Sequence, residues 1–288
     1  MTSHDVVGGI RRLFCTKKVG HTGTLDPNAT GVLPVLVGNA VKASDLLPET
    51  GKVYRAEVRF GAAFDTEDVW GKPVKTNDLR PDRASFEAAC RALTGEILQT
   101  PPMISAVKIR GKKLYEYARQ GVEVEREPRR VTVSSVKLLS FSENGAALRI
   151  ACSKGTYIRT LLVDICARCG VLGAMSALCR EESGGFSLEN AVTLAGLEDL
   201  TVPQRESLLI PAEQLFSRYP AVYLPSFFDK LVFNGLVVAQ SKLKTDHPAG
   251  QRLRLYRDGA FFALGEAVEE NGVLSLKKIK DFPPDDAN

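Results

Sequence analysis

Apolar and polar residues alternate strictly from position 54 to position 60, which is the clearest hydrophobic pattern in the chain. A period of two predicts a strand with one buried face and one solvent-exposed face. The face expected to be buried carries Tyr54, Ala56, Val58 and Phe60. Weaker signals of the same kind predict further strands at 104–109, 131–141 and 146–152.

Apolar residues at helical spacing predict single helices between these strands. The first is expected at 3–14, where Thr2 and Asp5 form a capping-box pattern ahead of apolar residues that recur every three or four positions. Further helices are expected at 39–47, 81–93, 113–120 and 160–170. Strands interleaved with single helices at irregular spacing favour an α+β fold with a mixed α/β sheet over a doubly wound one.

The pattern changes after residue 210, where Pro211, Pro220 and Pro225 indicate a domain boundary. Beyond it, the sequence predicts short strands at 252–256, 261–269 and 273–279. The dipeptides Asp-Gly at 258–259 and Asn-Gly at 271–272 are typical of tight hairpin turns. We therefore expect a large domain at 1–212 and a small β-barrel-like domain at 220–282.

The composition is that of an ordinary globular protein, with 288 residues, 44% of them apolar and 25% charged. The longest apolar run, at 32–37, is far shorter than a membrane span, and the polar start of the chain does not resemble a secretory signal. We therefore expect a cytoplasmic protein without a membrane partner. No glycine-rich phosphate loop or dinucleotide fingerprint is present, so no nucleotide cofactor is expected.

Six cysteines are too few for a disulfide framework in a chain of this length. Cys166 and Cys169 form a C-x-x-C pair, a spacing that zinc sites also use. The chain has no second such pair and only three histidines, and the pair falls in the helix expected at 160–170. We interpret both thiols as packing inward and expect no metal.

The net charge of +4 is spread unevenly along the chain. The segment 107–137 holds nine basic and four acidic residues, a local charge of +5. A second basic cluster comprises Arg11, Arg12, Lys17 and Lys18. Local positive charge on an otherwise balanced protein favours a nucleic acid as partner, although a solvated surface strip has the same pattern.

The segment 20–27, Gly-His-Thr-Gly-Thr-Leu-Asp-Pro, places one carboxylate, Asp26, in a loop of glycines and small hydroxyl residues. Glycine leaves room for another molecule to approach closely, and threonine supplies hydrogen bonds without bulk. A carboxylate presented in this way is a candidate nucleophile or general base. Asp before Pro is also a common start of a plain turn, so the loop alone leaves both interpretations open.

Four segments together resemble the TruB-type tRNA pseudouridine synthases. They are Gly20-His-Thr-Gly-Thr-Leu-Asp-Pro-Asn-Ala-Thr-Gly31, Lys52-Val-Tyr-Arg-Ala, Gly111-Lys-Lys-Leu-Tyr-Glu-Tyr-Ala-Arg-Gln-Gly121 and Cys152-Ser-Lys-Gly-Thr-Tyr-Ile-Arg-Thr160. The resemblance runs from about residue 2 to the end. It implies that 1–212 is a catalytic domain that flips out uridine 55 of the tRNA T-loop and isomerises it to pseudouridine. It also implies a PUA-like RNA-binding fold for 220–282 and the tRNA T-stem-loop as partner. Because the isomerisation involves no redox change, we expect no cofactor, and we expect a monomer.

The resemblance further implies roles for individual residues. Asp26 matches the family's nucleophile, which acts at C1′ or at C6 of the nucleotide, and Arg159 matches the arginine paired with it. Tyr54 matches the tyrosine that stacks on the uracil. His21 matches the histidine that helps to open the T-loop, and Tyr157 and Leu178 match residues that line the base pocket. Separately from the resemblance, the charge of the basic segment leads us to expect that Lys112 and Lys113 grip the T-stem. Taken singly, each position is also compatible with an ordinary structural role.

Members of this family begin with an apolar strand that carries a Lys-Pro pair, whereas Thr2-Ser3 follows the initiator methionine here. We expect in-frame coding sequence upstream to encode that strand. If the strand is truly absent, the alternative is a non-catalytic protein that binds or remodels tRNA. A related synthase acting on another RNA is a further alternative, and a carboxylate glycosidase is disfavoured because no partner acid is evident.

Overall fold

The computed structural model describes residues 1–47 and 51–282, which divide into two compact units. The first unit comprises 25–34 and 51–191, and the second comprises 2–24, 35–47 and 192–282. The domain limits expected from the sequence, 1–212 and 220–282, stay a prediction. Within the described ranges, none of the helices combines the length and the apolar character that crossing a membrane requires.

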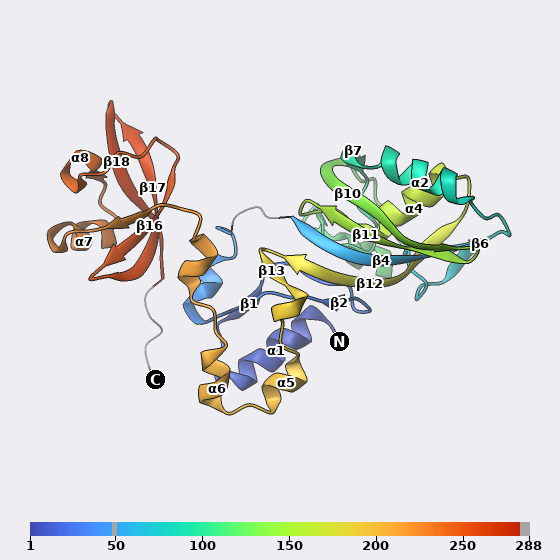
Figure 1. The fold of residues 1–288 in the computed structure, drawn as a ribbon, viewed down its shortest axis with the longest axis horizontal. Coiled ribbons are helices and arrows are strands. Elements are labelled where there is room, and N and C mark those ends of the chain that lie inside the picture. Colours follow the sequence, from blue (N-terminus) through green and yellow to red (C-terminus); the bar gives the residue numbers. More distant parts are fainter. Residues whose placement is uncertain (48–50, 283–288) are drawn as a thin grey trace. The chain divides into compact units, whose positions relative to one another are not determined.

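A sheet of seven strands forms the centre of the first unit (Figure 1). The strands are β2 (Thr30–Gly31), β4 (Lys52–Phe60), β7 (Gly95–Gln99), β10 (Arg129–Ser142), β11 (Gly145–Cys152), β12 (Gly173–Ser183) and β13 (Phe186–Ser187). Their order is β13-β12-β4-β11-β10-β7, all antiparallel, and β2 adds to β12 in parallel. These pairings confirm the mixed sheet of an α+β fold and the strands expected at 54–60, 131–141 and 146–152.

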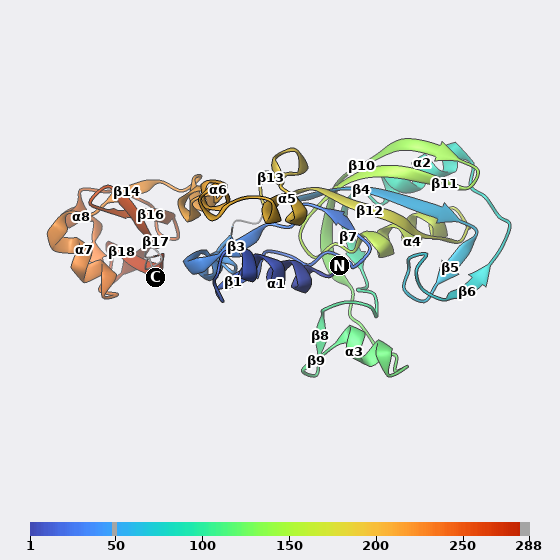
Figure 2. The same ribbon diagram turned by 90° about the horizontal axis from the view of Figure 1, so that it is seen from below.

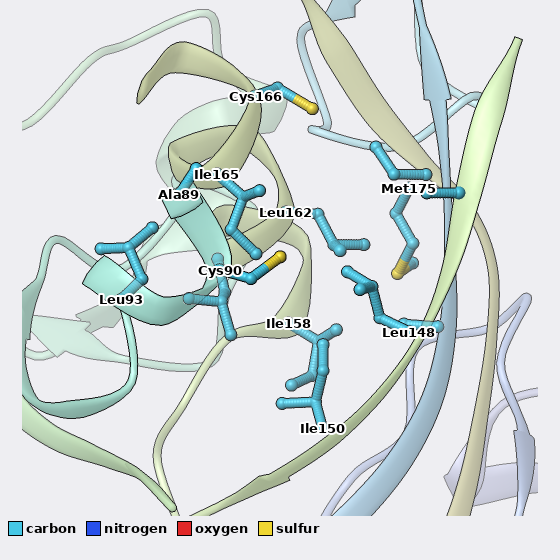
Figure 3. Packing of buried hydrophobic residues seen from close by; sticks show 14 of the residues in the cluster. Ala89, Cys90, Leu93, Leu148, Ile150, Ile158, Leu162, Ile165, Cys166 and Met175 are labelled. Carbon is cyan, nitrogen blue, oxygen red and sulfur yellow. The ribbon is translucent and has the colours of Figure 1, made fainter. Parts of the chain in front are cut away.

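Two helices, α2 (Arg83–Ala92) and α4 (Ile158–Arg168), pack on one face of this sheet. Figure 3 shows side chains of α4 directed toward Leu148 and Ile150 of β11. As predicted, the apolar residues of β4 belong to this core. Cys166 is fully buried and Cys169 packs against the same cluster, so both thiols lie inward. In the part of the chain that the structure describes, no group of three or more His, Cys, Asp or Glu side chains is placed to hold a metal ion.

A hairpin and a short helix project from this sheet (Figure 2). They are β8 (Lys108–Ile109), β9 (Lys112–Lys113) and α3 (Leu114–Arg119). The helix expected at 113–120 is confirmed, whereas the strand expected at 104–109 is wrong except for its last two residues. The reason is that the carbonyls of Ser105 and Val107 accept hydrogen bonds from the N–H groups of Tyr115 (3.1 Å) and Leu114 (2.8 Å). These backbone groups support the start of α3 and not a strand ladder.

In the second unit, α1 (Ser3–Leu13) packs with α5 (Leu194–Glu198) and with a small sheet of β1 (Val19–His21) and β3 (Val35–Val37). The predicted capping box is present, with reciprocal hydrogen bonds between Thr2 and Asp5. The helix expected at 39–47 is the shorter 3-10 helix η1 (Gly38–Ala43). Beyond Ala43 the chain continues as turns, in which the N–H groups of Leu46 and Leu47 both donate to the Ala43 carbonyl.

The second unit also contains α6 (Val202–Ser207), η3 (Ala212–Phe216) and a five-stranded sheet in the order β14-β16-β17-β18-β15. The strands are β14 (Ala221–Tyr223), β15 (Val238–Ala239), β16 (Arg252–Arg257), β17 (Ala260–Glu270) and β18 (Val273–Asp281), with helices α7 (Ser226–Phe233) and α8 (Gln240–Leu243) packed on them. Both predicted hairpin turns are confirmed, with positive φ at 258, 259, 271 and 272. This half-barrel is compatible with the expected barrel-like domain.

Candidate active site

The loop that carries Asp26 is anchored to the central sheet by the residues that follow it. The N–H of Ala29 donates to the Asp26 carbonyl over 2.9 Å, which closes a tight turn. Gly31 (φ +105°) then lies against β12, where a Cβ atom would come within 2.2 Å of the Arg180 carbonyl oxygen. Only glycine allows this approach, so the last residue of the motif fixes where the Asp26 loop joins the sheet.

Arg159, the second residue of α4, holds the Asp26 carboxylate from inside the protein. Its Nε donates to Oδ2 over 2.8 Å and its Nη2 donates to Oδ1 over 3.3 Å. The same guanidinium donates to the backbone carbonyls of Thr66 (2.7 Å) and Ile104 (2.9 Å). The Arg159 side chain is 3% exposed, whereas that of Asp26 is 36% exposed. This two-point contact with a fixed cation orients the carboxylate and leaves part of it open to a ligand.

A half-buried acid, Glu67, lies next to this pair and was not identified in the sequence analysis. Thr160 donates to Glu67 Oε2 over 2.6 Å, so consecutive residues of α4 hold Asp26 and Glu67. Burial raises the pKa of Glu67, while the Thr160 hydrogen bond and the charge of Arg159 oppose that rise. Glu67 has φ of +63°, an uncommon conformation for a residue with a side chain. In the sequence it stands in an acidic run that is typical of an exposed loop.

Tyr54 lies on the core side of β4 and is only 7% exposed. It pairs across the ladder with Arg180 of β12 and shares a hydrogen bond with the buried Arg180 guanidinium. The Arg180 Nε also donates to the Val32 carbonyl over 2.7 Å. Burial raises the pKa of Tyr54, the charge of Arg180 opposes the rise, and the Asp26 carboxylate adds to it. Tyr54 and Asp26 therefore lie within electrostatic range of one another.

Tyr157 and Leu178 belong to the same unit as Asp26. Tyr157 directly precedes α4. The Gln99 side-chain amide makes two hydrogen bonds to the Tyr157 backbone: it donates to the carbonyl over 3.0 Å and accepts from the N–H over 2.8 Å. Leu178 lies on β12 within the buried core cluster. These contacts fix where both residues sit but do not by themselves assign them to a substrate.

Asp26 and Arg159 line a pocket of about 230 Å³. Its other lining residues are Pro27, Asn28, Thr66, Asp68, Trp70, Ile104 and Met175. A second pocket of about 390 Å³ shares Asn28 and Trp70 with the first and includes Leu178. Among the described residues, Tyr54 and Tyr157 are absent from both linings. Trp70, which the sequence analysis did not single out, lines both pockets, whereas Tyr54 lines neither.

Lys112 and Lys113 lie on β9, in the projecting hairpin, and line neither pocket among the described residues. Their ammonium groups lie over the rings of Tyr117 (5.7 Å) and Tyr115 (5.4 Å), respectively. His21 lies in the second unit, in β1, where it pairs with Val35 of β3. The substrate roles of His21 and of both lysines stay predictions.

Known proteins resemble the chain over most of its length. Residues 11–158 match the model of the TruB family pseudouridylate synthase (N terminal domain). A protein named tRNA pseudouridine synthase B from Aromatoleum aromaticum is 42% identical, in an alignment that covers 97% of this chain and 89% of that protein. A protein of the same name from Geobacillus thermodenitrificans is 48% identical, in an alignment that covers 83% of this chain and 82% of that protein. A chain in the crystal structure of a Cbf5-Nop10-Gar1 complex is 25% identical with a TM-score of 0.71, over 99% of this chain and 83% of that one. The chain therefore belongs to the TruB family of pseudouridylate synthases.

Proposed function

We propose that this chain isomerises uridine to pseudouridine in tRNA, at position 55 of the T-loop, with Asp26 as the nucleophile. The observation that carries the proposal is the partly exposed Asp26 carboxylate held at both oxygens by the buried Arg159 guanidinium. Relatives that are 39–48% identical over most of the chain are named tRNA pseudouridine synthase B. The non-catalytic alternative is disfavoured because both members of the pair are present and in contact.

The reaction breaks the bond between N1 of uracil and C1′ and forms a bond between C5 and C1′. The hydrogen at C5 leaves as a proton and N1 gains one, so the reaction consumes no oxidant, reductant or other group. Asp26 adds to C1′ in one version of the mechanism and to C6 in the other, and it is released in both. Because Arg159 fixes the carboxylate, the attacking oxygen keeps its direction while the base turns.

Tyr54 supplies the ring that faces the detached uracil and the phenol that carries the C5 proton. Burial raises its pKa and keeps it in the neutral phenol form. The adjacent Arg180 charge opposes that rise and eases formation of the phenolate during proton transfer. Tyr157 and Leu178 complete the walls of the base site, and His21 helps to open the T-loop.

The RNA is gripped outside the reacting site. Flipping a base out of a folded loop costs a few kcal/mol, which contacts to phosphates offset. Lys112 and Lys113 on the projecting hairpin provide such contacts to the T-stem. The five-stranded half-barrel at the end of the chain acts as a PUA-like RNA-binding domain. We expect the protein to act as a monomer; Asp26, Arg159 and Tyr54 all come from one unit of one chain, so these three residues need no second copy.

A stem-loop RNA with the tRNA T-loop sequence tests the proposal. Wild-type protein should form carbodiimide-reactive pseudouridine at the position that corresponds to 55. Asp26→Asn should lower turnover by at least about a thousandfold while RNA affinity stays nearly unchanged. The matched control Asp78→Asn, at an exposed position of the same unit, should turn over like wild type.

Three outcomes would contradict parts of the proposal. Normal turnover by Asp26→Asn would overturn the nucleophile. Product at another uridine would overturn the assignment to position 55. RNA binding by wild-type protein without any product would favour the non-catalytic alternative.

A further inference from the structure

Trp70 is the only tryptophan of the chain, and its residue is 48% exposed. It lies in the loop between β5 (Ala62–Phe64) and β6 (Pro73–Thr76), beside the Asp26 pocket. Tryptophan is a large apolar residue that is usually well buried. A ring left open next to a reactive carboxylate points to a ligand that covers it.

Hydrogen bonds hold the Trp70 loop in one conformation. Asp68 Oδ1 accepts from the Thr66 hydroxyl (2.7 Å) and from the Trp70 N–H (3.2 Å). The Val69 N–H donates to the Met175 carbonyl on β12 over 2.9 Å. A ring carried by a fixed loop loses little freedom when a ligand docks on it, which favours binding.

Trp70 lines both of the pockets described above, so it stands where two adjoining spaces meet. One space contains Asp26, and the other extends over β4 and β12 toward Leu178. Of the described residues that line the Asp26 pocket, Trp70 alone is aromatic. A polynucleotide with one nucleotide at Asp26 would therefore bring a neighbouring base to the Trp70 ring.

The chemistry of the larger pocket fits a base better than a phosphate. Its lining combines the carboxylates of Glu57 and Glu181 with the guanidinium of Arg55 and several neutral polar groups. Glu181 is paired with Arg149 at 2.7 Å, which compensates part of its negative charge. Carboxylates repel phosphate but accept hydrogen bonds from the exocyclic amino group of a base. The volume of about 390 Å³ suits a small planar ligand.

We propose that Trp70 stacks on an unpaired base adjacent to the target uridine, and that this base occupies the larger pocket. The inference rests on the proposed function, because it requires the target nucleotide at Asp26. Aromatic side chains bind unpaired bases by stacking, largely independent of sequence. Trp70 therefore contributes to RNA binding. It stacks on the base next to the target uridine and so keeps that base from stacking on the target uracil.

Trp70 fluorescence provides a direct test because no other tryptophan contributes to the signal. The tryptophan fluorescence of Asp26→Asn protein should fall as the T-loop stem-loop RNA is added. The Kd obtained from this titration should equal the Kd from an independent filter-binding measurement. Unchanged fluorescence at saturating RNA would overturn the proposal.

Substitutions of the ring test its contribution. Trp70→Ala should bind the RNA about tenfold more weakly, with a smaller effect on kcat, and Trp70→Phe should recover most of the loss. Leu139→Ala removes an apolar residue that is 50% exposed on β10 and should bind like wild type. Wild-type protein should bind an RNA with an abasic nucleotide next to the target more weakly than the unmodified RNA. Trp70→Ala should bind the two RNAs with nearly equal affinity. Equal losses for both proteins would overturn the stacking role.

Conversion of the same RNA by wild-type protein separates the two proposals. If no pseudouridine forms, the proposed function fails and this inference fails with it. If wild-type protein forms pseudouridine and Trp70→Ala matches it in affinity and turnover, the stacking role alone fails.

Discussion

The Asp26 site and the projecting hairpin are both marked by dense sequence motifs, yet the structure holds them very differently. Arg159 is buried and makes four hydrogen bonds to groups on three separate segments. Lys112 and Lys113 stand on a two-residue strand, with tyrosine rings nearby. Bond breaking requires a fixed geometry, whereas phosphate binding requires charge within reach. The comparison predicts that conservative changes damage the first region and spare the second.

Among the changes that test this comparison, Arg159→Lys is expected to have the largest effect. A lysine keeps the charge but lacks the planar fork that contacts both Asp26 oxygens and the carbonyls of Thr66 and Ile104. Turnover should fall by about a hundredfold or more, with RNA affinity little changed. The free energy of unfolding should also fall by about 1–3 kcal/mol, because buried carbonyls lose their donor. Single-turnover kinetics and denaturant unfolding measure both effects.

The matched control for this change is Arg83→Lys on α2. Arg83 is exposed and pairs with Glu87, one helical turn away, so its replacement should alter neither turnover nor stability measurably. Wild-type turnover by Arg159→Lys would mean that charge alone suffices at Asp26, and the contrast with the hairpin would disappear.

A smaller effect is expected at the hairpin. The double variant Lys112→Ala/Lys113→Ala should weaken RNA binding and make the slope of log affinity against log salt shallower by about 2. Turnover at saturating RNA should not change. Lys112→Arg/Lys113→Arg should bind like wild type, in contrast to Arg159→Lys.

The control for the hairpin is Lys75→Ala/Arg91→Ala, which removes the same charge from exposed positions of the same unit outside the basic segment 107–137. It should leave the salt slope nearly unchanged. Equal slopes for wild type and the Lys112/Lys113 variant would place the RNA grip elsewhere on the protein.

The smallest effect concerns pH and Glu67. Because burial raises the pKa of this acid above its ordinary value of 4.5, the folded state binds its proton more tightly than the unfolded state does. The resulting stability is present below pH 4.5 and is lost as pH rises through the folded-state pKa. Glutamine cannot titrate and its side-chain oxygen can still accept the hydrogen bond from Thr160. The Tm of Glu67→Gln relative to that of wild type should therefore rise as pH is raised. Thermal unfolding between pH 4.5 and 8 measures this, and a constant difference in Tm would contradict it.

The sequence predicted local features well because local features depend on local patterns. The alternation along β4 and the Asp-Gly and Asn-Gly turns each involve residues close together in the chain. The segment at 104–109 looked like a strand, but its backbone groups bond to the start of α3, which no periodicity records.

The candidate site divides in the same way. Asp26 and Arg159 were predictable from motif residues, and the structure brings them into contact. The carbonyls of Thr66 and Ile104 could not be predicted as partners of Arg159. Every residue carries a backbone carbonyl, and only the fold determines which ones face Arg159. Trp70 was missed because a single exposed ring has no pattern of its own.

The reach of Arg159 across the chain has a consequence during synthesis. Its three partners precede it by 133, 93 and 55 positions, so a ribosome delivers Asp26 long before the arginine that orients its carboxylate. A nascent chain that ends before α4 contains Asp26 but lacks Arg159, which orients the Asp26 carboxylate in the folded protein. If Asp26 is the nucleophile as proposed, such a chain should be inactive toward RNA until α4 has emerged and docked.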